Sequence, residues 1–118
     1  MALRVIRLRH LIKDITVLSS SENELAISRV SIENRIFSHI QEKESLNQQL
    51  QHGLINAEVW GMKTDILENY ITEDENLVND IQTKIWHKEQ ERSNLESELE
   101  RYSQEEIDRI TNRLGLFQ

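Results

Sequence analysis

Apolar residues recur every three or four positions along the first half of the chain. Alternating steps of three and four from Leu8 to Leu50 meet thirteen positions, and nine of these are Leu or Ile. A seven-residue repeat with two apolar positions is typical of a helix that packs along a narrow seam on another helix. No Gly or Pro interrupts the repeat. It therefore predicts one helix whose partner is a second helix, either of this chain or of another protein.

Four seam positions are polar, and they are the places where this helix could be interrupted. They are Glu22, Arg29, His39 and Lys43. Polar seam residues weaken the packing but can fix register and partner choice. Ser21 and Glu24 also have the spacing of a capping box, at which a helix can restart. Because the apolar repeat runs through them unbroken, we expect a continuous or slightly bent helix.

A turn is predicted in the middle of the chain. Gly53 suits the left-handed conformation that often follows a helix end. Asn56 is a good N-cap for the next helix, and Ile55 and Trp60 have the spacing of a hydrophobic staple. We therefore expect a turn near residues 53–56, a first arm at about 3–52 and a second arm at about 56–114.

The second arm has a less regular pattern. Thr72-Glu73-Asp74-Glu75 is another capping box, which predicts either a short helix followed by a long one or a single helix with a kink near Thr72. Gly115 suits the end of the arm. Because the two arms have similar lengths, we expect an all-α fold in which they form an antiparallel two-helix coiled-coil hairpin. The hairpin is expected to be a monomer and to form one unit of residues 1–118. A parallel homodimer of bent chains is the alternative.

Composition fits exposed helices around a thin core. The chain is 37% hydrophobic and 30% charged, with no Pro and no Cys. The hydrophobic share is below the roughly 45–50% typical of globular domains. Without Cys, neither a disulfide nor a Cys-containing zinc site can form. No apolar run approaches the roughly 20 residues of a membrane-spanning helix.

Charge is unevenly distributed, although the net charge is −7. Residues 1–13 carry four basic and no acidic residues, whereas residues 53–118 carry fifteen acidic and seven basic residues. A hairpin would place the basic start beside the acidic segment 89–108, which favours antiparallel pairing. The basic amphipathic start also resembles a mitochondrial targeting segment or a helix on an anionic membrane. We favour the start of the coiled coil, because Leu8 and Leu11 share the phase of the whole seam.

No catalytic or cofactor motif is found. The four histidines lack the spacing of a helical metal site, and there is no Gly-rich phosphate loop or nucleophile motif. We therefore expect no enzymatic activity, no cofactor and no metal. The acidic net charge and the lack of aromatic residues within the basic run argue against nucleic acid. Trp86 follows the seam residue Ile85 and points elsewhere, so it is a candidate partner contact.

Two stretches carry a resemblance to a known family. One is the opening run Arg4-Val5-Ile6-Arg7-Leu8-Arg9-His10-Leu11, and the other is Ile85-Trp86-His87-Lys88-Glu89-Gln90-Glu91-Arg92. With a continuous first helix and a mid-chain turn near Trp60, the chain resembles the small stalk proteins of type III export systems, the FliJ/YscO group of flagella and injectisomes. The resemblance covers nearly the whole chain as a pattern, although the net charge is more acidic than that of the flagellar members.

The resemblance implies a function in bacterial protein export and virulence. Members of the FliJ/YscO group are cytoplasmic hairpins at the inner-membrane export apparatus. The end with both termini enters the pore of the hexameric export ATPase and stimulates ATP hydrolysis, while other surfaces contact the export gate or chaperones. The rival interpretations are a small helical export chaperone and a structural coiled-coil subunit. The expected partner-binding residues are Arg4, Arg7, Leu8, Arg9, Lys13, Trp86, Arg101, Arg109 and Arg113.

Overall fold

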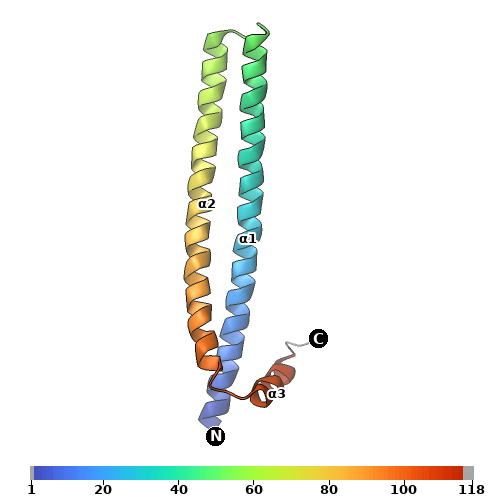
Figure 1. The fold of residues 1–118 in the computed structure, drawn as a ribbon, viewed down its shortest axis with the longest axis vertical. Coiled ribbons are helices and arrows are strands. Elements are labelled where there is room, and N and C mark those ends of the chain that lie inside the picture. The colour runs from blue at the N-terminus through green and yellow to red at the C-terminus, as the bar shows by residue number, and fades with distance from the viewer. Residues whose placement is uncertain (1, 116–118) are drawn as a thin grey trace. The chain divides into compact units, whose positions relative to one another are not determined.

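Three α-helices make up residues 2–115, the part of the chain that the computed structural model describes (Figure 1). Helix α1 spans Ala2–Gln51, α2 spans Ala57–Leu99 and α3 spans Gln104–Leu114. No strand is present in this described range. The predicted all-α class is confirmed.

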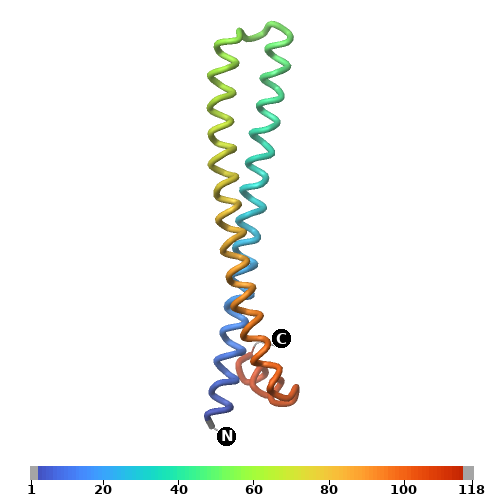
Figure 2. Tube along the Cα trace, turned by 60° about the vertical axis from the view of Figure 1, so that its left-hand side comes forward, coloured from blue at the N-terminus to red at the C-terminus, as the bar shows by residue number. Residues whose placement is uncertain are grey.

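Contacts divide the chain into two compact units. The terminal unit consists of Met1–Leu25 and Lys84–Gln118, and the turn unit consists of Ala26–Thr83. Within each unit α1 and α2 run antiparallel and side by side (Figures 1 and 2). The helix that α1 packs on is therefore α2 of the same chain, as the hairpin interpretation predicts.

The predicted seam of α1 is confirmed position by position. Each of the thirteen heptad positions from Leu8 to Leu50 is buried or half-buried. The fully buried positions on this seam belong to leucines: Leu8, Leu11, Leu18 and Leu46. Leu67 is buried on α2. The core is thin because each long helix contributes only one stripe.

Three charged residues of α1 form ion pairs with α2: the seam residues Glu22 and Lys43, and Arg35, which lies beside the seam. In the terminal unit Arg92 Nε donates to Glu22 Oε2 at 2.7 Å. In the turn unit Arg35 donates to both carboxylate oxygens of Asp74, at 3.2 and 2.5 Å. In both pairs a residue of α1 meets the residue of α2 that an antiparallel register places opposite it. A slip in register would leave the largely buried carboxylates of Glu22 and Asp74 without partners, which is costly.

The turn forms where it was predicted. Gly53 has φ +68°, the left-handed conformation that side chains avoid. Asn56 caps α2, because its Oδ1 accepts a hydrogen bond from the Val59 amide at 2.8 Å. Trp60 also holds the turn, since its Nε1 donates to Asn47 Oδ1 at 2.8 Å.

Neither capping box inside the arms starts a helix. Helix α1 runs through Ser21 and Glu24 without interruption, as the unbroken repeat predicts. The alternative of two helices meeting near Thr72 is wrong, because α2 is continuous from Ala57 to Leu99. Thr72 is exposed, while Asp74 is buried and paired, so the local capping signal yields to packing along the seam.

The expectation that the second arm continues to residue 114 is also wrong. Helix α2 ends at Leu99, and Ser103 adopts extended dihedrals (φ −72°, ψ 154°) before α3 begins. A complete capping box explains the break. The Ser103 hydroxyl accepts from the Glu106 amide at 3.2 Å, and the Glu106 carboxylate accepts from the Ser103 amide at 3.2 Å.

Helix α3 turns back onto the terminal unit (Figure 2). Its Ile110 packs with Leu8 and Ile12 of α1 in a buried cluster. Partly buried apolar side chains surround this cluster: Leu99, Tyr102, Ile107 and Leu114. The terminal unit is therefore a three-helix arrangement, in contrast to the two-helix arm that was expected.

Candidate functional site

The four cations of the basic opening run lie on two different sides of α1. Arg4 and Arg7 form ion pairs with α3 and α2, whereas Arg9 and Lys13 lie on the exposed side of α1. The division follows from helical periodicity, because residues separated by three or four lie on one side of a helix. The four cations expected to act together therefore have two roles, one structural and one available to a partner.

Arg4 ties α3 to α1. Its Nε and Nη2 donate to the two carboxylate oxygens of Glu106 at 3.0 and 3.2 Å, and Nη2 also donates to the Arg101 carbonyl at 3.2 Å. Its guanidinium carbon lies 4.4 Å from the centroid of the Tyr102 ring, within the range of a cation–π contact. The hydrogen bond from Arg4, followed by that from the Ser103 amide, lowers the pKa of Glu106 to about 2.

Arg7 ties α1 to the end of α2. Its Nε donates to Glu98 Oε1 at 2.9 Å, and its Nη2 pairs with the other carboxylate oxygen. This hydrogen-bonded pairing lowers the pKa of Glu98 below its usual value. Because both partners are partly exposed, the pair mainly fixes the arrangement of the two helices and adds little to stability.

Leu8 is not available to a partner in this structure, contrary to the expectation. Its side chain is only 1% exposed and lies in the cluster beneath α3. The additional helix α3 covers it.

An exposed basic and apolar face remains on α1. Ile6, Arg9, His10 and Lys13 line a shallow groove there. Leu3, 82% exposed, occupies the same helical side at a spacing of three from Ile6. No ion pair of Arg9 or Lys13 is present within residues 2–115. We call the set Leu3, Ile6, Arg9, His10 and Lys13 the basic face.

The three C-terminal arginines lie in the same unit as the basic face, as expected for a hairpin. Arg101 is exposed in the segment between α2 and α3, where its carbonyl accepts from Arg4. Arg109 is exposed on α3 and lies 3.6 Å from Glu105. Arg113 is exposed in the last turn of α3, where a cation is favourable to the helix dipole.

Trp86 is exposed, as its place directly after the seam residue Ile85 predicts. Its side chain is 55% exposed, and its ring contacts that of His87 edge-on with centroids 5.1 Å apart. The neighbouring seam residue Ile85 is half-buried. Trp86 thus has the accessibility that a partner contact requires, on α2 of the terminal unit.

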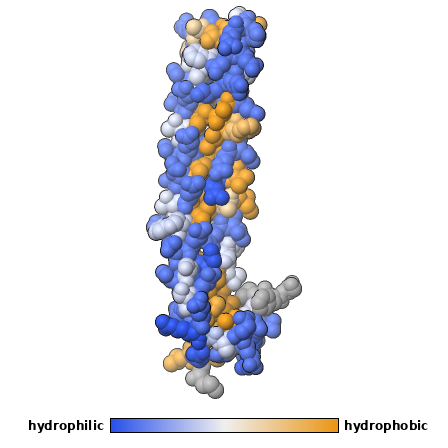
Figure 3. Space-filling model, in the orientation of Figure 1, coloured by the Kyte–Doolittle hydropathy of each residue, from blue (hydrophilic) through white to orange (hydrophobic). Residues whose placement is uncertain are grey.

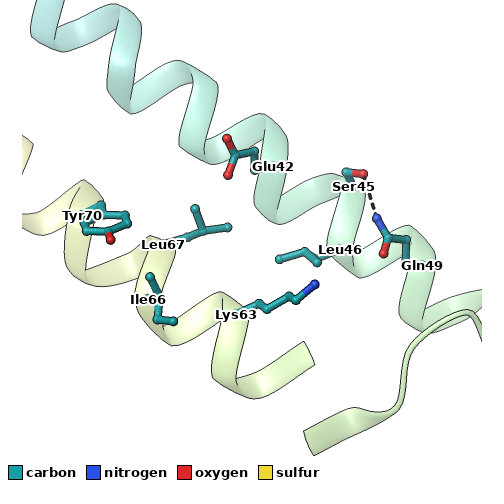
Figure 4. A pocket seen from close by; sticks show the side chains of 8 residues that line it. All are labelled: Glu42, Ser45, Leu46, Gln49, Lys63, Ile66, Leu67 and Tyr70. Atoms are coloured by element: carbon teal, nitrogen blue, oxygen red, sulfur yellow. Dashed lines mark hydrogen bonds between the residues drawn. The ribbon is translucent and has the colours of Figure 1, made fainter. Parts of the chain in front are cut away.

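The turn unit has a groove that the sequence reasoning missed. Figure 4 shows it between α1 and α2, with Leu46 and Leu67 at its floor and Ile66 and Tyr70 on one side. Its volume is about 390 Å³, and its polar lining comes from Glu42, Ser45, Gln49 and Lys63. The available signal was the spacing of Met62, Ile66 and Tyr70, which places a second apolar stripe on α2 beside the seam.

Further apolar side chains of the turn unit are exposed on α1. They are Ile27, Val30, Phe37 and Ile40. Figure 3 shows apolar areas on the otherwise largely hydrophilic face in view. Exposed apolar clusters of this kind are frequent at protein–protein contacts.

The described residues contain no group of three or more His, Cys, Asp or Glu side chains that could hold a metal ion. No helix within residues 2–115 combines the length and hydrophobicity needed to cross a bilayer. Comparisons with known protein families, curated proteins and solved structures find no match for this chain.

Proposed function

We propose that this chain is a stalk protein of a type III export apparatus, which binds the hexameric export ATPase through its terminal unit and increases the rate of ATP hydrolysis. The resemblance of the opening run to the FliJ/YscO group motivates the proposal. Its main structural support is the basic face, in which Arg9 and Lys13 are exposed while the other two cations of the opening run are already paired. On this proposal the chain acts in the bacterial cytoplasm at the inner-membrane apparatus.

The chemistry of such a contact is electrostatic with an apolar contribution. Exposed cations attract carboxylates on a partner and speed association, and this attraction weakens as salt increases. Leu3 and Ile6 add apolar area beside Arg9 and Lys13. A helix that presents a few similar cations can exchange them between equivalent subunits of a ring. The chain supplies no reacting group and acts by binding alone.

The test is ATP hydrolysis by a purified type III export ATPase, titrated with the full chain. We expect stimulation that saturates near one chain per hexamer. Reversing both free cations, Arg9→Glu and Lys13→Glu, is expected to abolish stimulation without changing helicity measured by circular dichroism. These positions are preferable to Arg4 and Arg7, because reversal of a paired arginine also disrupts the terminal unit.

Lys63→Glu is the matched control. Lys63 is an exposed cation of the turn unit, so the same reversal there leaves stimulation intact under this proposal. Full stimulation by the Arg9→Glu/Lys13→Glu variant would contradict the assignment of the basic face. The single reversals Arg9→Glu and Lys13→Glu change the net charge by the same amount as the control, and equal losses in all three would indicate an effect of net charge alone.

A second candidate is a small helical export chaperone, and the exposed apolar surface of the turn unit favours it. The groove at Leu46, Ile66, Leu67 and Tyr70 and the exposed Phe37 offer area for a protein substrate or for the export gate. Mass in solution separates the candidates. A monomer supports the stalk, whereas a dimer that melts with little cooperativity supports the chaperone. A structural subunit would show neither stimulation nor substrate binding.

A further inference from the structure

Helix α3 covers an apolar surface of α1 that belongs to the basic opening run. Leu8 and Ile12 lie beneath Ile110, and Ile107 and Leu114 pack against the edge of this cluster. Arg4 borders the same surface and pairs with Glu106 at 3.0 Å. Each of these contacts joins α3 to the part of the chain that the proposed function assigns to partner binding.

The end caps of α3 lie within residues 103–115 and need no contact with α1 or α2. The Ser103–Glu106 capping box satisfies its first turn, and Gly115 in the left-handed conformation closes its last turn with a bond to the Asn112 carbonyl. Its backbone ends are therefore satisfied within residues 103–115. Short helices are marginal in isolation, and such caps reduce the cost of forming one.

The hold of α3 on the terminal unit is small. Among its residues only Ile110 and Thr111 are fully buried, and its side-chain ion pair to α1 is between two partly exposed groups. Partly exposed ion pairs contribute little. Residues 100–103 are the sole covalent connection to α2. A competing helix with the same pattern can therefore replace α3.

We propose that the surface under α3 is a binding surface for an amphipathic helix of a partner protein, and that α3 is its internal competitor. This inference rests on the proposed function, because it concerns the same opening run. The partner's chemistry follows from α3 itself: a carboxylate at the position of Glu106, followed by apolar residues at the positions of Ile107, Ile110 and Leu114. The partner's carboxylate would form an ion pair with Arg4, and its apolar face would cover Leu8 and Ile12.

The basic face provides the first contact in this arrangement. Arg9 and Lys13 are exposed while α3 is docked, and Ile12 beside them is buried. An acidic helix attracted by the free cations would thus arrive next to the covered surface. If α3 is docked in about 90% of molecules, the apparent Kd of the partner is about tenfold higher than for a chain with α3 undocked.

Release of α3 in the full chain tests the inference. Ile110→Asp places a charge against Leu8 and undocks α3, and we expect it to tighten binding to the purified export ATPase about tenfold. Asn112→Asp adds the same charge on the exposed side of α3 and is expected to leave the Kd unchanged. Circular dichroism checks that α1 and α2 remain folded in both variants.

Hydrogen exchange of the unmodified chain provides a measurement that does not depend on any variant. On binding the ATPase, amides of residues 104–114 are expected to lose protection while those of α1 gain it. If the ATPase binds while α3 stays protected, and Ile110→Asp leaves the Kd unchanged, α3 is not a competitor. That result would leave the proposed function intact. A weaker Kd for Ile110→Asp would also overturn the inference that α3 is a competitor, because α3 would then be part of the binding surface. Absence of binding by every variant would overturn both proposals.

Discussion

Truncation of a single seam leucine tests the register of the terminal unit most directly. Leu11 is completely buried, whereas Leu3 on the same helix is 82% exposed. Leu11→Ala and Leu3→Ala remove the same atoms from positions about two turns apart on α1. The difference between the two variants therefore isolates burial from helix propensity, because Ala and Leu are both strong helix formers.

The magnitude follows from the burial of each side chain. Burying a leucine fully is worth about 1.5–3 kcal/mol, and Leu→Ala in protein cores costs about 2–5 kcal/mol when a cavity remains. In a thin seam the neighbours can partly close the space, so we expect about 2–3 kcal/mol for Leu11→Ala. Leu3→Ala is expected to stay within about 0.5 kcal/mol of the parent, as is usual for surface positions.

Thermal unfolding followed by circular dichroism measures the effect and also reports on cooperativity. Unfolding entropy near 2.1 cal/mol/K per residue predicts a fall in Tm of about 10 °C if all 118 residues unfold together. If the terminal unit unfolds alone, the same free energy shifts its own transition by about twice as much. Equal Tm values for Leu11→Ala and Leu3→Ala would refute the assignment of Leu11 to the seam.

Three further changes probe the turn, the seam and α3. Gly53→Ala places a side chain at φ +68° and is expected to lower the free energy of unfolding by about 1 kcal/mol. Gly61→Ala adds a side chain in open space within α2 and is expected to raise it by about 0.5–1 kcal/mol. Urea unfolding measures both changes. Arg92→Glu is expected to lower the Tm by placing two carboxylates together, and Glu22→Arg in the same chain should restore it. Because the pKa of Glu106 is lowered to about 2, its contribution to stability is full above about pH 4.5 and is lost as pH falls towards 2. An NMR titration of its carboxyl carbon checks this, and a midpoint near 4.5 would contradict the pairing with Arg4.

Much of the fold could be predicted because it depends on local patterns. The heptad repeat from Leu8 to Leu50 determined which side of α1 is buried, and Gly53 with Asn56 located the turn. These signals act within one or two turns of helix, so a single sequence contains them in full. The polar seam positions were also identified, although their partners on α2 depend on an antiparallel register that local patterns do not define.

The candidate site was predicted less well, because tertiary packing decides which cations are free. Sequence alone treated Arg4, Arg7, Arg9 and Lys13 as equivalent, and only the positions of α2 and α3 distinguish them. The start of α3 could have been found from the capping box at Ser103. The prediction instead followed the apolar periodicity through Ser103, whereas the similar capping signal that it noted at Thr72 is unused.

The seam's charged residues explain how two helices with interchangeable apolar residues keep one register. On α1 a leucine or isoleucine recurs in every heptad, so at most positions a slip of seven residues would exchange one apolar contact for another at little cost. The same slip would move Glu22 from Arg92 to Ile85 or Leu99, burying a carboxylate beside an apolar side chain. Such an unpaired charge costs several kcal/mol, more than a thin seam can offset. The apolar repeat therefore makes the helices associate, and the ion pairs select which of the possible associations is stable.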